Sequence, residues 1–243
     1  MKNLKVKVRR SDASGASHYQ TYTVPYYPGM RLLDALIYIQ ENLDPSLSFR
    51  FNCRAGRCGS DGMELNGKPV LACKYTISSE ESEFTISPMR VFPVTRDLVV
   101  NLSEAWKDAV KIPAFESSQR SDTPAIIDKE KIEEVRGLKR CIECFLCQDV
   151  CHVLRTKNAA YIGPRWVAKA ASYDKHPLDK IRNRSSQLAK NGLWKCNISR
   201  CCQENCPEKI RITDDAIISA KEQDVDETVS IGAMLRRLRK GRK

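Results

Sequence analysis

A run of four cysteines within eleven residues constrains this chain more than any other feature. Residues 141–151 read CIECFLCQDVC. Spacings of two, two and three residues gather the first three sulfurs around one small volume in a winding loop and displace the fourth onto the next turn. Thiols this close in sequence bind a metal centre or form disulfides, and the cellular compartment decides between the two.

The N-terminal sequence argues against secretion. It reads MKNLKVKVRR, which carries charge but lacks the apolar core of a signal peptide. The longest apolar run, at residues 32–39, is interrupted and too short to span a bilayer. We therefore expect a cytosolic chain without signal peptide or transmembrane segment, in which clustered thiols indicate metal binding rather than disulfides.

The spacing of the run is that of bacterial ferredoxins, in which the fourth cysteine serves a different iron-sulfur cluster from the first three. The run therefore predicts a second group of cysteines that completes two half-built sites. That group is Cys196, Cys202 and Cys206. With 243 residues, the chain is long enough for two small domains, each with a core of its own.

A formal net charge of +11 leaves several kinds of partner open. This value counts every cysteine as neutral, whereas metal-bound thiolates and clusters are anionic and cancel part of it. The remaining positive charge lies largely in residues 180–184 and in the C-terminal sequence MLRRLRKGRK. A solvated tail is the simplest interpretation, followed by an anionic lipid surface or an acidic partner, and then by nucleic acid.

The N-terminal part of the chain predicts a small sheet with one helix. Residues 4–10 and 19–25 alternate polar and apolar side chains on either side of a turn rich in Ser and Gly, which predicts a hairpin. Residues 30–43 change to helical spacing and predict an amphipathic helix packed on the sheet. A β-rich segment follows, and residues 84–88 are expected to form its last strand.

A glycine-rich loop at Cys53 is the second motif that indicates metal binding. Its glycines let the backbone wrap tightly and aim amide groups at a bound anion, as the sulfides of a cluster require. They are Gly56, Gly59 and Gly62. Four residues separate Cys53 from Cys58, as at the start of the plant-type 2Fe-2S ferredoxin pattern. The third ligand of that pattern falls on Asp61, which either binds iron or caps the turn.

The segment at residues 91–140 joins the two cysteine-bearing halves. It reads as a strand end and a helix, followed by a polar connection into another helix. We place the domain boundary within residues 100–113 and divide the chain into residues 1–105 and 106–243. The C-terminal half has few β-type alternations, which predicts helices between the cysteine loops.

Three motifs together resemble the iron-sulfur subunits of succinate dehydrogenase and fumarate reductase, the succinate:quinone oxidoreductases. They are CRAGRCGSDGMELNGKPVLAC, CIECFLCQDVC and CNISRCCQENCP, and the likeness runs from about residue 4 to residue 218. The resemblance implies an α+β chain with an N-terminal β-grasp domain of the plant-type 2Fe-2S ferredoxin kind. It also implies a C-terminal all-α domain that is similar to bacterial ferredoxins and carries two clusters.

The same resemblance implies the ligands of three clusters. Those of a 2Fe-2S cluster would be Cys53, Cys58, Asp61 and Cys73. Those of a 4Fe-4S cluster would be Cys141, Cys144, Cys147 and Cys206. Those of a 3Fe-4S cluster would be Cys151, Cys196 and Cys202. Cys201 is then a spare thiol or a fourth ligand of the last cluster, and Ser199, at the expected ligand position, favours the three-iron form.

Departures from the common family pattern bear on the quinone. Thr156 and Asn197 stand where ubiquinone-using members of the family carry a Trp and a His. The cysteine runs look closer to a bacterial variant associated with menaquinone, so menaquinone is the expected quinone. His152 and Trp166 are the residues expected near it, with a purely structural role as the alternative for each.

The resemblance also implies partners. The chain has no G-x-G-x-x-G and no other flavin fingerprint, so succinate oxidation is expected on a partner flavoprotein that carries FAD. Electrons would pass from that FAD through the three clusters to quinone at a membrane anchor subunit, and the partner subunits are where haem would also be found. We expect this complex at the cytoplasmic face of the bacterial inner membrane.

Two other classes of protein compete with this interpretation. A zinc-ribbon protein that binds nucleic acid would explain both the cysteines and the basic charge, but zinc sites use separated C-x-x-C pairs rather than three consecutive ligands and a displaced fourth. We therefore expect no nucleic-acid partner. The nearer rival is an iron-sulfur subunit that serves another reductase, such as a glycolate- or thiol-linked enzyme.

Overall fold

A computed structural model describes residues 2–11, 15–118, 124–156, 160–181 and 183–228, and the chain divides into two compact units. Unit 1 comprises Met1–Glu104, Ile142–Val150 and Asn205–Glu208. Unit 2 comprises Ala105–Cys141, Cys151–Glu204 and Lys209–Lys243. Two short segments from the C-terminal half of the sequence thus belong to the unit that the N-terminal half builds. The predicted division at residues 105 and 106 stays a prediction.

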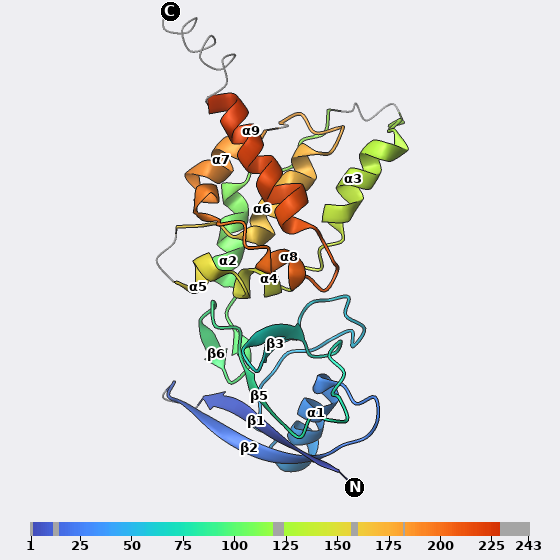
Figure 1. Cartoon of the computed structure of the whole chain (residues 1–243), viewed down its shortest axis with the longest axis vertical. Coiled ribbons are helices and arrows are strands. Elements are labelled where there is room, and N and C mark those ends of the chain that lie inside the picture. Colours follow the sequence, from blue (N-terminus) through green and yellow to red (C-terminus); the bar gives the residue numbers. More distant parts are fainter. Residues whose placement is uncertain (1, 12–14, 119–123, 157–159, 182, 229–243) are drawn as a thin grey trace, which may run out of the picture. The chain divides into compact units, whose positions relative to one another are not determined.

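The described residues of unit 1 form a five-stranded sheet with the strand order β2-β1-β5-β3-β4. Its strands are β1 (Asn3–Ser11), β2 (Ser17–Pro25), β3 (Gly62–Leu65), β4 (Lys68–Leu71) and β5 (Glu83–Ser87). The hairpin partners β1 and β2 pair antiparallel, whereas β1 and β5 pair parallel. The first and last strands of the sheet in sequence therefore lie side by side at its centre (Figure 1).

Alternating burial along β1 shows that one face of the sheet packs on the core. Leu4, Val6 and Val8 are fully buried, while the lysines between them point to the other face. The buried face is covered by α1 (Leu32–Tyr38), whose Leu32, Leu33 and Leu36 are also buried (Figure 1). Hydrophobic burial between sheet and helix therefore forms the core of unit 1.

Two local features of unit 1 differ from the expectation. The predicted helix over residues 30–43 begins at Leu32 and turns into a π-helical segment, η1 (Ile39–Leu43). The chain also adds a two-stranded ribbon, β6 (Val94–Arg96) and β7 (Val99–Val100), so residues 84–88 are not the last strand of the segment. Asp97 fixes the turn of this ribbon, because its buried carboxylate accepts hydrogen bonds from the amides of Ser11 and Ser48.

The described residues of unit 2 are organised as helices. The longer ones are α3 (Lys129–Lys139), α6 (Pro164–Asp174), α7 (Ser185–Lys190), η4 (Ile212–Ile218) and α9 (Ser219–Thr228). The shorter ones are α2 (Ser103–Lys107), η2 (Asp108–Lys111), α5 (His152–Arg155), η3 (Leu193–Lys195) and α8 (Cys201–Glu204). A further short helix, α4 (Leu146–Asp149), belongs to unit 1. Together the sheet and the helices give the α+β organisation that the sequence predicts.

Helix α6 is the centre of unit 2. It begins at Pro164, a favoured first residue of a helix, directly after Gly163 with a φ of 90°. It lies beside α3 and η4, and α9, which continues directly from η4, lies beside α7 (Figure 1). Arg184, which is fully buried, pairs with Asp174 at the end of α6 and with Asp179, and so fixes the connection that follows the helix.

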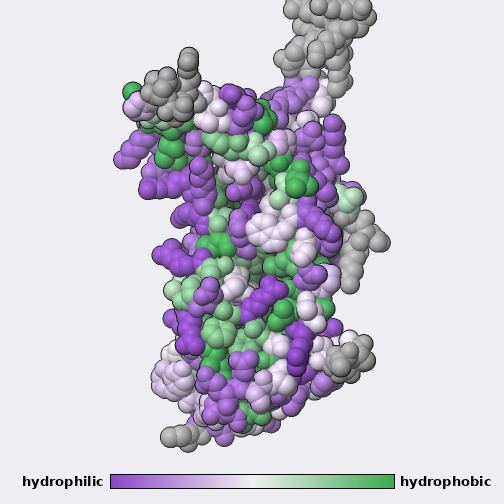
Figure 2. Space-filling view, turned by 180° about the vertical axis from the view of Figure 1, so that it is seen from behind, coloured by the Kyte–Doolittle hydropathy of each residue, from purple (hydrophilic) through white to green (hydrophobic). Residues whose placement is uncertain are grey.

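The surface carries apolar and polar residues together. Figure 2 shows hydrophilic side chains spread over one face of the molecule, with apolar side chains between them. Within the described part of the chain, no helix combines the length and the apolar character that crossing a membrane requires.

Candidate iron-sulfur sites

The loop after Cys53 surrounds that sulfur with backbone amides. The N–H groups of Ala55, Arg57 and Cys58 donate to Cys53 Sγ at 3.4, 3.2 and 3.3 Å. This geometry needs left-handed backbone at Arg54, Gly56 and Gly59, which have φ values of 54°, 65° and 66°. The amide hydrogen bonds favour the thiolate and lower the pKa of Cys53 to about 7.

Cys73 and Asp61 form the buried side of the same site. The Cys73 amide donates to Asp61 Oδ2 at 2.6 Å, and burial together with the Asp61 carboxylate raises the pKa of Cys73 to about 12. Asp61 is 2% exposed, and its second oxygen, Oδ1, has no hydrogen-bond partner among the described residues. A buried carboxylate oxygen without a partner is costly unless a cation or a donor satisfies it. This observation fits Asp61 as a metal ligand.

The first cysteine run packs against the glycine-rich loop within unit 1. A Cβ atom at Gly59 would lie 2.7 Å from the carbonyl oxygen of Ile142 and 2.9 Å from Cα of Cys144. These neighbours are backbone or directly attached to it, so only glycine allows the two loops to approach this closely. The sequence places Gly59 and Cys144 far apart, and the fold makes them neighbours.

Segment Asn205–Glu208 returns to the same unit and carries Cys206 with it. Asn205 Nδ2 donates to the carbonyl oxygen of Pro69 at 3.1 Å, and Lys74 Nζ donates to that of Pro207 at 3.4 Å. A recess of about 250 Å³ is lined by Leu146 from the first run together with Pro69, Asn205 and Pro207. Unit 1 thus contains three of the predicted 4Fe-4S ligands, Cys144, Cys147 and Cys206, and Cys141 directly precedes its second segment.

The two cysteine runs share one backbone pattern. In each, the second and fourth residues after the first cysteine have left-handed backbone, and a short helix follows. The residues are Glu143 (59°) and Phe145 (60°) in the first run, and Ile198 (59°) and Arg200 (60°) in the second. Alternation of left- and right-handed backbone turns successive N–H groups toward one concave side, which suits an anion such as a cluster.

This shared backbone pattern aligns the residues of the second run with those of the first. Helix α4 begins at Leu146 and α8 begins at Cys201, so Cys201 corresponds to a leucine of the first run. By the same offset, Ser199 corresponds to Cys144. The second run therefore has a hydroxyl at a predicted ligand position and its extra thiol at a position that is not a predicted ligand.

The third set of predicted ligands converges within unit 2. Cys151 and Cys202 are buried, and burial raises the pKa of both thiols, to about 12 for Cys202. Cys201 and Cys196 raise both values further, because a neighbouring thiolate is a like charge. Cys202 Sγ lies 3.4 Å from Oγ1 of the buried Thr213. Helix packing therefore brings Cys151 to two cysteines that follow much later in the sequence.

The donor chemistry suits iron-sulfur clusters. All eleven cysteines lie in the described part of the chain, and none forms a disulfide. Four cysteines bind a four-iron cluster. Groups of cysteines placed around a loop of backbone amides, as at Cys53, match the ligand arrangement of such a cluster.

Comparison with known proteins gives the family. Residues 5–107 match the model of a 2Fe-2S iron-sulfur cluster binding domain, and residues 137–210 match that of a 4Fe-4S dicluster domain. The fumarate reductase iron-sulfur subunit of Haemophilus influenzae is 35% identical over 84% of this chain and 88% of its own length. The chain belongs to the fumarate reductase and succinate dehydrogenase iron-sulfur subunit family. The fold class and the 2Fe-2S and 4Fe-4S cofactors that the sequence predicts are thereby confirmed.

Two further proteins of this kind are also similar to the chain over most of its length. The fumarate reductase iron-sulfur subunit of Mycobacterium tuberculosis is 33% identical over 85% of this chain and 86% of its own length. Among solved structures, a chain of the Mycobacterium smegmatis Sdh1 complex in the apo form has 37% identity and a TM-score of 0.87, covering 95% of this chain and 98% of that one. This family member is therefore an electron-transfer subunit of an oxidoreductase complex.

The two residues expected near the quinone have contrasting surroundings. His152 is exposed and begins α5, directly after Cys151. Trp166 is 2% exposed and packs edge-on against Trp106 at 5.6 Å, with the Arg165 guanidinium over its ring. Their proximity to a quinone stays a prediction.

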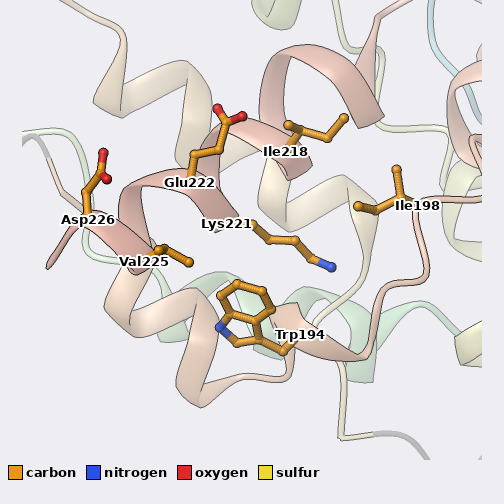
Figure 3. Close-up of a pocket in the computed structure, with 7 residues that line it drawn as sticks. All are labelled: Trp194, Ile198, Ile218, Lys221, Glu222, Val225 and Asp226. Carbon is orange, nitrogen blue, oxygen red and sulfur yellow. The ribbon is translucent and has the colours of Figure 1, made fainter. Parts of the chain in front are cut away.

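Sequence reasoning missed an apolar groove beside Cys196 in this family member. The groove is open, has a volume of about 340 Å³ and is lined by residues of η3, η4, α9 and the second cysteine run. These residues are Trp194, Ile198, Ile218, Lys221, Glu222, Val225 and Asp226 (Figure 3). Trp194 and Ile198, which flank Cys196, were the signal in the sequence, but the groove also needs α9, which comes from a separate segment.

Proposed function

We propose that this subunit conducts electrons one at a time between the FAD of a partner flavoprotein subunit and a quinone at a membrane anchor subunit of a succinate:quinone oxidoreductase. The observation that carries the proposal is that donors far apart in the sequence interact at two of the predicted sites. Cys53 and Asp61 act on Cys73 at the first site, and Cys196 acts on Cys151 and Cys202 at the third. Membership of the family supports this role, since its members are subunits of succinate dehydrogenases and fumarate reductases, which use the same electron path in opposite directions.

We propose one ligand set for each of three clusters. The first is Cys53, Cys58, Asp61 and Cys73 for a 2Fe-2S cluster. The second is Cys141, Cys144, Cys147 and Cys206 for a 4Fe-4S cluster. The third is Cys151, Cys196 and Cys202 for a 3Fe-4S cluster. Ser199 at the position that corresponds to Cys144 supports three irons rather than four in the third site.

The chain's own residues would hold each group and set its electrostatic surroundings. Bound clusters supply one-electron transfer, and ligand type, hydrogen bonds to sulfur and burial set their potentials. Amides donate to the exposed Cys53, whereas Cys73 and Asp61 are buried on the opposite side of the first site. In the third site, Cys151 and Cys202 are buried, which excludes water from them, whereas Cys196 is half-buried.

We place the quinone at the groove beside Cys196. Lys221 Nζ donates to the carbonyl oxygen of Cys196 at 2.6 Å and lies over the Trp194 ring, 5.2 Å from its centre (Figure 3). Trp194 Nε1 donates to Asp224 Oδ2 at 2.7 Å, which holds the indole at the mouth of the groove. Apolar walls with one cation near a ligand of the third site suit a lipid-soluble quinone. Menaquinone is our preferred quinone, and exposed His152 is a second candidate contact.

The remaining parts of the proposal concern the assembly. The flavoprotein with its FAD would dock against the N-terminal domain, and the anchor would hold the subunit at the cytoplasmic face of the bacterial inner membrane. Haem, where present, would belong to the anchor.

The test is low-temperature electron paramagnetic resonance on the purified complex, reduced stepwise with succinate and with menaquinol. We expect three cluster signals, one of them a three-iron signal of the oxidised state, and reduction by both reagents. Zinc in place of iron and acid-labile sulfide would contradict the proposal. A copurifying flavoprotein without activity on succinate would instead support an iron-sulfur subunit of another reductase.

A further inference from the structure

Tyr161 has a buried hydroxyl that the fold leaves without a hydrogen bond. Its side chain is 5% exposed, and the hydroxyl makes no well-formed hydrogen bond with any described residue. Burying a hydroxyl without a partner costs free energy, so native structures usually satisfy it. A donor without a well-formed partner in the interior therefore needs an acceptor close by.

The backbone around Tyr161 is fixed against the segment that leads to Cys196. The Ile162 amide donates to the carbonyl oxygen of Asn191 at 2.9 Å. At Gly192, which has a φ of 84°, a Cβ would lie 2.0 Å from the carbonyl oxygen of Ala160 and 2.9 Å from Cα of Tyr161. Only a glycine allows this approach, and η3 then leads directly from Gly192 to Cys196.

The surroundings of the Tyr161 hydroxyl are the three sulfurs of the third site. Burial raises the pKa of Tyr161 well above its ordinary value of 10, and Cys196, Cys151 and Cys202 raise it further. Cys196 is within interaction range of the hydroxyl itself. The phenol carries one O–H group that is available as a hydrogen-bond donor.

We propose that the Tyr161 hydroxyl donates a hydrogen bond to a sulfur of the third cluster site and thereby raises the reduction potential of that cluster. The inference rests on the proposed ligand set of Cys151, Cys196 and Cys202. Reduction adds negative charge, and a hydrogen bond to sulfur stabilises the more negative state. Tyr161 acts through the sulfur and is therefore a positioning residue for electron transfer, since it accepts no electron itself.

Thr213 supplies the comparison within the same site. Its hydroxyl already lies 3.4 Å from Cys202 Sγ, so one ligand of the set has a hydroxyl neighbour from η4. Tyr161 comes from a different segment, just before α6, and would supply a second donor. In the first site, backbone amides donate the hydrogen bonds to the Cys53 sulfur.

The experiment compares the complete complex with its Tyr161→Phe variant, which loses only the hydroxyl. A redox titration followed by electron paramagnetic resonance gives the midpoint potential of each cluster. We expect the third cluster of the variant to be harder to reduce, with about a tenfold change in the ratio of oxidised to reduced cluster at a fixed potential, which is ~59 mV for a one-electron couple. The other two clusters should keep their potentials.

Tyr173→Phe is the matched control, because Tyr173 lies on α6 and its ring contacts Phe115 and the cations of Lys169 and Arg184 instead of cysteines. Its third-cluster potential should equal that of the wild type. A second measurement, proton resonances coupled to the cluster before and after exchange into D2O, should show an exchangeable proton that Tyr161→Phe lacks.

Three results would overturn the inference. The third-cluster potential of Tyr161→Phe could equal that of the wild type at full iron and sulfide content, which would leave the ligand assignment intact. The variant could lose the third cluster altogether, which would make Tyr161 a packing residue. A wild-type complex without a third-cluster signal would contradict the proposed ligand set, and this inference with it.

Discussion

Cys53 and Cys73 are predicted to bind the same cluster, yet their surroundings differ strongly. Cys53 is exposed and receives three amide hydrogen bonds, whereas Cys73 is buried beside a carboxylate. The pKa of Cys53 is lowered to about 7, and that of Cys73 is raised to about 12. The Cys73 thiolate and the Asp61 carboxylate repel one another, and a bound cation removes this repulsion.

We predict that Asp61→Cys keeps the 2Fe-2S signal with a shifted midpoint potential, because a softer thiolate replaces the carboxylate oxygen at the same position. Asp61→Ala should weaken the signal, since it removes the donor. Electron paramagnetic resonance and iron analysis measure both effects. Asp108→Ala, which removes a carboxylate from η2, should change neither. A full signal in Asp61→Ala would show that Asp61 is not a ligand.

Ser199 and Cys201 give a second prediction. Ser199→Cys should convert the third cluster to a four-iron form, because the repeat places residue 199 where Cys144 stands in the first run. The three-iron signal of the oxidised complex should disappear. Cys201→Ser should keep that signal, because position 201 corresponds to Leu146. If Cys201→Ser alters the cluster type instead, Cys201 is a ligand.

The cysteine spacings carry most of what the sequence could predict about the candidate sites. Cysteine spacing predicted the loops and the family resemblance. Alternation of polar and apolar residues along β1 and β2 predicted the hairpin. The ribbon β6-β7 was missed because Asp97 holds it through amides from distant segments. The approach of residue 160 to Gly192 was also not predictable, since it depends on packing and not on local propensity.

Strands β1 and β2 and the end of η1 are joined by a charged network at Arg10. Arg10 is 6% exposed. Its guanidinium donates hydrogen bonds to Asp44 and Tyr22, and its Nε lies 3.1 Å from Asp97 Oδ1. Hydrogen bonds from Ser46 and Tyr22, together with that from Arg10, hold the pKa of Asp44 well below its ordinary value of 3.8. The network stabilises the sheet wherever Asp44 is ionised.

We predict a pH-dependent effect for Asp44→Asn. A lowered pKa in the folded state means that the contribution of Asp44 is fully present above the pKa of the unfolded chain and is lost as the pH falls through the folded pKa. The variant should lose about 2 kcal/mol of unfolding free energy at neutral pH. Urea unfolding at a series of pH values should show this loss shrinking below about pH 4.

Asp215→Asn is the control for this series, because its carboxylate is more exposed and lies 3.8 Å from a single exposed arginine, Arg211. Its unfolding free energy should stay within about 0.5 kcal/mol of the wild type. A loss in Asp44→Asn that stays constant down to the most acidic sample would contradict the assigned role of Asp44.

For the whole molecule, cluster binding and folding should share one free energy. Cys151 is predicted to share a cluster with Cys196 and Cys202, so the cluster would crosslink distant segments of unit 2. We predict that anaerobic iron chelation lowers the helical circular dichroism signal and opens unit 2 to limited proteolysis. Iron and sulfide added back should restore both. An unchanged helical signal in protein shown to be free of iron would contradict this coupling.

Unit 1 includes Asn205–Glu208, and this has a consequence for synthesis on the ribosome. Domains generally fold as units while the chain emerges from its N-terminal end. Here the sheet is made early, but the unit that contains it cannot be completed until translation has passed residue 208. A nascent chain therefore has an unfinished surface from the time its sheet forms until residue 208 has been made.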